Sequence, residues 1–125
     1  MMKLALVAHN NKKEEILSIV DKYKELLEQC TLFSTRQTGE MIENKFHIKV
    51  NKVKSGPTGG DIEIANMVVD QKLDVLIFLI DPLSSHCHEN DIQSLVRLSI
   101  LDNVVLATNY ATACTVLDSL SKHLN

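Results

Sequence analysis

Five short polar stretches hold the residues whose types could do chemistry: residues 9–13, 34–39, 54–61, 81–91 and 108–112. The third stretch, KSGPTGGD, is the most unusual, because it contains three of the four glycines in the chain. Glycine lets the backbone approach a ligand closely, and the hydroxyl of Ser55 can donate a hydrogen bond. Asp61 either caps the helix that follows or acts as a general base. The spacing matches neither the GxxxxGK[ST] loop nor the GxGxxG loop of nucleotide-binding sites.

Two further stretches have the composition of anion-binding sites. HNNKK (9–13) places His9 beside Lys12 and Lys13, which either bind an anion or remain in solvent at a helix start. STRQTG (34–39) places hydroxyls before a helix, where they either bind a phosphate or cap the helix. Each pattern alone leaves both alternatives open.

The stretch DPLSSHCHEND (81–91) gathers histidines, acids and a cysteine after the most apolar run of the chain. We expect a neutral His88 to hydrogen-bond a substrate carbonyl, with neighbouring acids fixing its tautomer. A zinc site is disfavoured, because structural zinc needs paired ligand spacings and the chain offers no second pair. A hydrolase built on Cys87 is disfavoured, because an adjacent histidine rarely reaches the thiol. The last stretch, TNYAT, is interpreted as a helix entry.

Alternating apolar and amphipathic segments must position these stretches. Asp61 is expected to be the N-cap of the third helix, and Ile92, Leu95, Val96 and Ser99 to share one face of the fourth. The alternation predicts an α/β fold in one domain, 1–125: a three-layer, doubly wound, Rossmann-like parallel sheet of five strands with helices on both faces. All five polar stretches then follow strands at the edge where such sheets bind ligands. Strands are expected at 3–8, 31–34, 47–53, 73–80 and 103–108, and helices at 11–30, 38–46, 61–72, 89–101 and 110–124.

Composition excludes several classes of function. The net charge of −3 and the 4% of aromatic residues argue against nucleic acid or an anionic membrane as a partner. No run approaches the length of a membrane helix, and the apolar run near the N-terminus is too short for a signal peptide. Three cysteines without CxxC spacing, Cys30, Cys87 and Cys114, predict reduced thiols and a cytoplasmic location.

Five motifs together resemble those of the methylglyoxal synthase family, in the same order, from Lys3 to about Leu117. The resemblance implies a doubly wound fold and a homo-oligomer, typically a hexamer. It implies a lyase that converts dihydroxyacetone phosphate to methylglyoxal, with inorganic phosphate as product and inhibitor and without metal or organic cofactor. The motifs are LALVAHNNKK, STRQTG, KSGPTGGD, DVLIFLIDPLSSHCHENDIQSLVRL and LATNYATA.

The resemblance also implies roles for individual residues. Asp61 matches the base that removes a proton from the hydroxymethyl carbon, His88 matches a hydrogen-bond donor to the substrate oxygens, and Asp91 lies nearby as a third catalytic residue. His9 contacts the substrate. By the same resemblance, the phosphate is expected to be held by Lys13, Thr35, Thr38, Ser55 and Gly56, with the backbone of Arg36 and Gln37.

Several positions depart from the family pattern. Asn10 stands where an Asp usually follows the histidine, which removes a charge near His9. Arg36 and Gln37 replace smaller residues, and Cys87 and Asn90 replace prolines. Longer members carry a C-terminal arginine thought to reach a neighbouring phosphate site; without it, weaker regulation by phosphate is expected, with Arg97 as an alternative cross-subunit contact.

Two other classes of function compete with the enzyme. A non-catalytic regulatory module of the same fold would bind phosphorylated metabolites and would need neither Asp61 nor His88. A structural protein would tolerate changes at Gly56, Gly59 and Gly60. Because both chemical residues are present, the sequence favours the enzyme.

Overall fold

The structure is a computed structural model that describes residues 2–53, 60–70, 72–84 and 90–124, apart from the side chains at 61, 90, 91 and 124. Five strands form one sheet in the order β3-β2-β1-β4-β5, and every neighbouring pair is parallel. This order confirms the expected doubly wound sheet. The strands are β1 (Lys3–Ala8), β2 (Thr31–Thr35), β3 (Asn51–Val53), β4 (Val75–Leu79) and β5 (Val105–Ala107).

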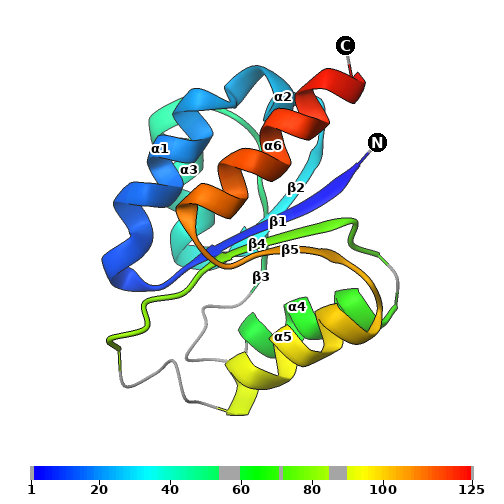
Figure 1. The fold of residues 1–125 in the computed structure, drawn as a ribbon. Coiled ribbons are helices and arrows are strands. Elements are labelled where there is room, and N and C mark those ends of the chain that lie inside the picture. Colours follow the sequence, from blue (N-terminus) through cyan, green and yellow to red (C-terminus); the bar gives the residue numbers. More distant parts are fainter. Residues whose placement is uncertain (1, 54–59, 71, 85–89, 125) are drawn as a thin grey trace.

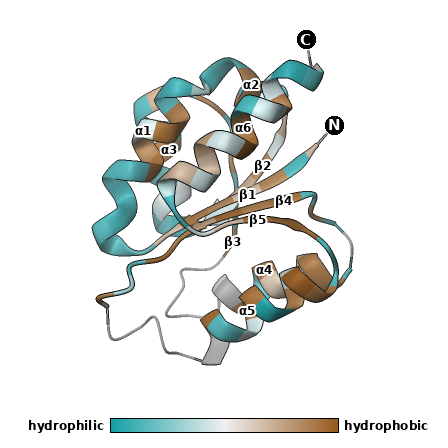
Figure 2. Ribbon diagram, viewed as in Figure 1, coloured by the Kyte–Doolittle hydropathy of each residue, from teal (hydrophilic) through white to brown (hydrophobic). Residues whose placement is uncertain are grey.

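The helices cover both faces of the sheet (Figure 1). On one face lie α1, α2, α3 and α6, and on the other α4 and α5 pack against each other. The strands lie between them as the most hydrophobic layer, while α1 turns a hydrophilic surface outward (Figure 2). The bounds are η1 (Asn10–Lys12, a 3-10 turn), α1 (Lys13–Lys22), α2 (Lys24–Glu28), α3 (Arg36–Phe46), α4 (Gly60–Val69), α5 (Asn90–Leu101) and α6 (Tyr110–Leu124).

Side-chain alternation along the strands produces two apolar cores. Leu4 and Leu6 of β1 point to the four-helix face, whereas Ala5 and Val7 point to α4 and α5. β4 is buried over all five of its residues, as expected for a central parallel strand covered on both faces. The amphipathic pattern of α5 is confirmed, because Ile92, Leu95 and Ser99 are buried and Val96 is half-buried.

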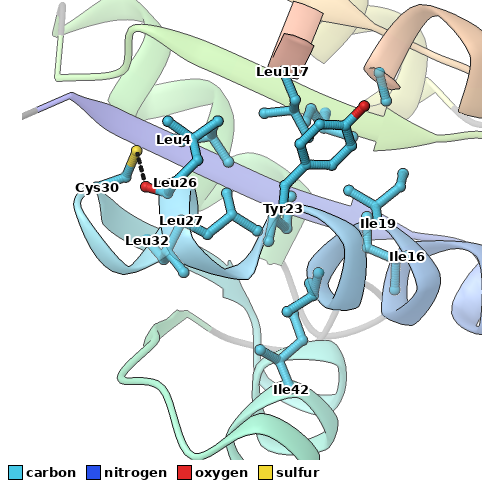
Figure 3. Packing of buried hydrophobic residues seen from close by; sticks show 14 of the residues in the cluster. Leu4, Ile16, Ile19, Tyr23, Leu26, Leu27, Cys30, Leu32, Ile42 and Leu117 are labelled. Atoms are coloured by element: carbon cyan, nitrogen blue, oxygen red, sulfur yellow. Dashed lines mark hydrogen bonds between the residues drawn. The ribbon is translucent and has the colours of Figure 1, made fainter. Parts of the chain in front are cut away.

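The single helix predicted over 11–30 is wrong, because the chain forms η1, α1 and α2 instead. The break between α1 and α2 falls at Tyr23, whose ring is buried beside Ile19 and Leu117 (Figure 3). Its hydroxyl donates to Asp118 Oδ1 at 2.7 Å and to the carbonyl of Cys114 at 3.1 Å. These contacts with α6 are made at the residue where the helix breaks, although the helical spacing of apolar residues continues through it in the sequence.

The strand predicted over 47–53 is shorter than expected and begins only at Asn51. His47 ends α3 in the left-handed conformation, with φ 58°. Ile48 and Val50 are buried around the exposed Lys49, which explains the strand-like alternation. The N–H of Val50 donates to Glu43 Oε2 at 3.0 Å, so the α3 side chain takes a donor that a strand ladder would use.

Candidate active site

The carboxyl ends of all five strands meet at one edge of the sheet. At the centre of this edge lie β1 and β4, which pair from Leu4↔Val75 to Ala8↔Leu79. After β1 the chain enters α1 on one face, and after β4 it enters α5 on the other face. Such a divergence between neighbouring parallel strands opens a crevice at which doubly wound proteins bind ligands. The residues following β1 and β4 are therefore the first place to look for a site.

His9 lies at this divergence and its ring is held from two sides. Its Nδ1 atom accepts a hydrogen bond from the backbone N–H of Asp81 at 2.9 Å. The ring packs edge-on against Phe78, with ring centroids 5.4 Å apart and an interplanar angle of 84°. Because Nδ1 is an acceptor, the proton of the neutral ring is on Nε2. His9 is thus arranged as a neutral hydrogen-bond donor.

Asp81 follows β4 and is buried, with 6% of its surface exposed. Its carboxylate accepts two hydrogen bonds, from Asn11 Nδ2 at 2.9 Å and from the backbone N–H of Leu83 at 3.0 Å. The bond from Asn11, followed by the one from Leu83, holds the pKa of the Asp81 carboxyl below its usual range. The ionised carboxylate therefore fixes the turn that contacts His9.

Lys13 opens α1 and turns inward instead of remaining in solvent. Its ammonium donates a hydrogen bond to the hydroxyl of Thr38, which is buried in the first turn of α3. Burial lowers the pKa of Lys13, because the charged form loses hydration. The neighbouring Lys12 instead forms an ion pair with Glu15 at 3.1 Å. Of the two lysines, Lys13 is the one placed to meet an anion.

The start of α3 lies beside this ammonium, and the first N–H groups of a helix have no partner within the helix. The helix begins at Arg36, two residues earlier than predicted. Thr35 is the N-cap residue and is buried, but its hydroxyl makes no capping hydrogen bond. Arg36 and Gln37 are exposed. A helix start next to a cation and two hydroxyls has the donors that a phosphate group requires.

The predicted acids Asp61 and Asp91 are placed by their backbone alone. Asp61 is the second residue of α4, which begins at Gly60, so the prediction of Asp61 as the N-cap is wrong and the residue lies inside the first turn. A carboxylate in the first turn is still favoured by the helix dipole. Asp91 is the second residue of α5. Both helices begin at the carboxyl edge of the sheet (Figure 1). Ser55, Gly56 and His88 lie outside the described residues.

Sequence reasoning missed Asn11 and Asp81 as members of the site. Asp81 comes two residues after β4, as His9 comes directly after β1, and the two strands are neighbours. A prediction of strand order would have brought these two loops together. No sequence pattern singles out Asn11 as a site residue, because asparagine is common in polar loops.

Metal ligation has no support among the described residues. No group of three or more His, Cys, Asp or Glu side chains is placed to hold a metal ion in that part of the chain. The histidines at 86 and 88 are outside it. Cys30 and Cys114 are free thiols.

Comparisons with known proteins indicate the family of the chain. A family model described as the MGS-like domain matches residues 15–108. A methylglyoxal synthase of Thermoanaerobacterium thermosaccharolyticum is 41% identical over 123 residues, which cover 98% of this chain and 92% of that protein. An uncharacterized protein of Synechocystis sp. is 45% identical over 119 residues, but this chain spans 28% of its length.

A solved structure gives the same result. The crystal structure of methylglyoxal synthase from Elizabethkingia anophelis superposes with a TM-score of 0.86 and 34% sequence identity, covering 93% of this chain and 76% of that one. With the domain match and the relatives above, this places the chain in the methylglyoxal synthase family.

Proposed function

We propose that the protein is a lyase that converts dihydroxyacetone phosphate into methylglyoxal and inorganic phosphate. The observation that carries the proposal is the arrangement at one sheet edge of a neutral histidine donor and an ammonium–hydroxyl pair beside a helix start. The first suits a carbonyl oxygen and the second a phosphate group. Dihydroxyacetone phosphate contains both within one small molecule.

The reaction begins with a carbon acid next to a carbonyl. Asp61 takes a proton from the hydroxymethyl carbon, and the C–H electron pair forms the double bond of an enediolate. His9 and His88 donate hydrogen bonds to the oxygens that gain charge, as a neutral histidine does in triosephosphate isomerase. The enediolate then expels phosphate by breaking the C–O bond at the far carbon. The resulting enol takes a proton at that carbon and becomes methylglyoxal.

The phosphate subsite supports the second step. The ammonium of Lys13, the hydroxyls of Thr35 and Thr38 and the first N–H groups of α3 stabilise the charge that grows on the leaving group. Ser55, Gly56, Arg36 and Gln37 complete the subsite, and Asp91 lies beside the reacting end. Phosphate, which is the product, competes with the substrate for the same donors and inhibits the enzyme.

The proposal includes the cellular location and the oligomeric state of the enzyme. The protein acts in the cytoplasm, in line with the two free thiols among the described residues. It acts there as a homo-oligomer. No helix in the part of the chain that the structure describes is long and apolar enough to cross a membrane.

The base assignment is tested by replacing Asp61 with Asn. We expect Asp61→Asn to lower kcat by at least about a thousandfold, since proton abstraction loses its acceptor, with unchanged circular dichroism. Asp70→Asn, at the exposed far end of α4, is the matched control and should retain native turnover. A folded Asp61→Asn protein with native kcat would remove Asp61 from the mechanism. Saturable binding of the substrate without turnover by the native protein would favour a regulatory module.

A further inference from the structure

Asn11 joins the two loops that follow the central strands. It lies in η1, directly after β1, and its amide reaches the carboxylate of Asp81 after β4 at 2.9 Å. η1 leads into α1 on one face of the sheet and the turn at Asp81 leads towards α5 on the other. The hydrogen bond therefore links the two loops at the point where the chain leaves β1 and β4 towards opposite faces of the sheet.

The carboxylate that Asn11 holds also organises the backbone of its own turn. Asp81 Oδ1 accepts from the N–H of Leu83 at 3.0 Å, and the carbonyl of Asp81 accepts from the N–H of Ser84 at 3.2 Å. Both bonds keep residues 81–84 in a tight turn. With the side chain fixed at both oxygens, the remaining backbone donor of Asp81 has a defined direction.

That donor is the N–H which contacts His9 Nδ1 at 2.9 Å. Two backbone hydrogen bonds also hold this region. The N–H of His9 donates to the carbonyl of Leu79 at 3.1 Å, and the N–H of Lys12 donates to the carbonyl of His9 at 2.8 Å. The edge-on contact with Phe78 limits rotation of the ring. The direction in which Nε2–H points therefore depends on the position of the Asp81 N–H.

We propose that Asn11 is a positioning residue that, by holding the Asp81 carboxylate, fixes the backbone N–H that keeps His9 as an Nε2–H donor aimed at the substrate oxygen. Asn11 touches neither His9 nor the substrate in this role. A neutral donor held in one orientation stabilises the enediolate more than the ketone, because the enediolate oxygen carries more charge. Loss of the Asn11 bond should thus lower kcat and leave KM nearly unchanged. This inference rests on the proposed function for its kinetic part alone.

The experiment combines nitrogen NMR of the histidine rings with steady-state kinetics on the intact protein. In native protein without substrate, the His9 ring should show a protonated Nε2 and an unprotonated Nδ1, and the amide of Asp81 should exchange slowly with solvent. The spectrum of His9→Gln assigns the His9 signals by their absence. Asn11→Ala should speed exchange at the Asp81 amide at least tenfold and lower kcat about tenfold, with KM within about twofold of native.

A second substitution at Asn11 and a control at Asn109 test whether the effects come from loss of the Asn11 hydrogen bond itself. Asn11 is exposed, so its replacement leaves the core intact, and Asn11→Leu repeats the test with a side chain of similar size and no donor. Asn109→Ala removes another asparagine hydrogen bond at the same edge, the 2.8 Å bond to the N–H of Thr112 that starts α6. It should lower thermal stability without changing kcat or the His9 spectrum.

The inference is overturned if native His9 is protonated at Nδ1, or if Asn11→Ala and Asn11→Leu leave both Asp81 exchange and kcat at native values. The NMR measurements need no turnover, so they decide the hydrogen-bonded arrangement even where the native protein makes no methylglyoxal. A native protein that makes no methylglyoxal would contradict the proposed function, but it would not contradict the hydrogen-bonded arrangement.

Discussion

Lys13 is a charged residue whose burial disfavours its charged form. Its ammonium is half-buried against Thr38, and desolvation lowers its pKa from the ordinary value of 10.5. Below the lowered pKa the cation is intact and holds phosphate. As pH rises through that pKa, the cation is lost earlier than a solvated lysine would lose it. We therefore expect kcat/KM for dihydroxyacetone phosphate to fall on an alkaline limb centred below pH 10.5.

Lys13→Arg tests the origin of that limb, because arginine keeps its charge at every accessible pH. The variant should bind substrate less well at neutral pH, since the guanidinium has a different shape, and its alkaline limb should disappear. Lys12→Arg is the control, because Lys12 pairs with Glu15 at the surface. Identical alkaline limbs in the native protein and Lys13→Arg would show that Lys13 does not control substrate binding.

At the scale of residues, the sequence indicated that the stretches after the first two strands lie near each other, but not what surrounds the histidine. Lys13 contacts Thr38 because the junctions after β1 and β2 lead into helices on the same face of the sheet. The bond from Asp81 to His9 was not predictable, because it comes from a backbone N–H whose direction no residue type encodes. The catalytic and substrate-binding roles of all the predicted site residues stay predictions, those of His9, Lys13 and Thr38 included.

Among the elements, the junction of α1 and α2 is tied to α6 by the hydroxyl of Tyr23. Tyr23 is 7% exposed and its hydroxyl donates to Asp118 and to the carbonyl of Cys114 in α6. Tyr23→Phe should lower the free energy of unfolding by about 1 kcal/mol, because Asp118 is exposed and water replaces the lost donor. Tyr110→Phe removes a surface hydroxyl contact with Ser18 at 3.3 Å and should cost less. Equal stability of native protein and Tyr23→Phe in urea unfolding would contradict the assignment.

The Tyr23 hydroxyl also makes the free energy of unfolding depend on pH in a predictable direction. Burial, followed by the hydrogen bonds to Asp118 and Cys114, raises the pKa of Tyr23 above its ordinary value of 10.0. A raised pKa means that the folded state retains the proton more tightly than the unfolded chain. The stabilisation is complete below pH 10.0 and is lost as pH rises towards the folded pKa. The difference in stability between native protein and Tyr23→Phe should therefore be constant at neutral pH and shrink above pH 10.0.

Elements were predictable where local pattern and tertiary environment agree. β1 and α6 have the bounds expected from apolar runs and helical spacing. The helix break at Tyr23 and the late start of β3 were not predictable. In both cases a hydrogen bond involving a side chain, from Tyr23 to α6 or from the N–H of Val50 to Glu43, accompanies the departure from the pattern.

At the scale of the whole molecule, the outer surface of α5 and the edge strand β5 is unusually apolar. Ile100 and Leu101 are 68% and 67% exposed, Val105 is 46% exposed, and a hollow of about 370 Å³ beside them is lined by Ile92 and Val96 among others. Exposed apolar surface of this kind is typical of contacts between proteins. We expect a second copy of the chain to cover it.

Light scattering after size-exclusion chromatography tests this expectation. Native protein should elute as an oligomer, and the double variant Ile100→Lys, Leu101→Lys should shift towards monomer, because two buried ammonium groups are costly. Ser119→Lys, exposed on α6 at the other face of the sheet, should not change the mass. A native protein that is monomeric at micromolar concentration would contradict self-association.

The doubly wound sheet was predictable from the alternation of segments, and the strand order agrees with it. The expectation of a single domain over 1–125 remains a prediction. Surface features such as the apolar end of α5 were not predictable, because one face of an amphipathic pattern does not reveal whether further apolar residues are exposed.

The central claim is that one site both removes a proton and expels phosphate. Its most direct test is a discontinuous assay in which purified protein is incubated with dihydroxyacetone phosphate, methylglyoxal is trapped, and released phosphate is counted. We expect equal amounts of the two products, and we expect Asp61→Asn to lose both. Phosphate release without methylglyoxal, or substrate binding without either product, would contradict it.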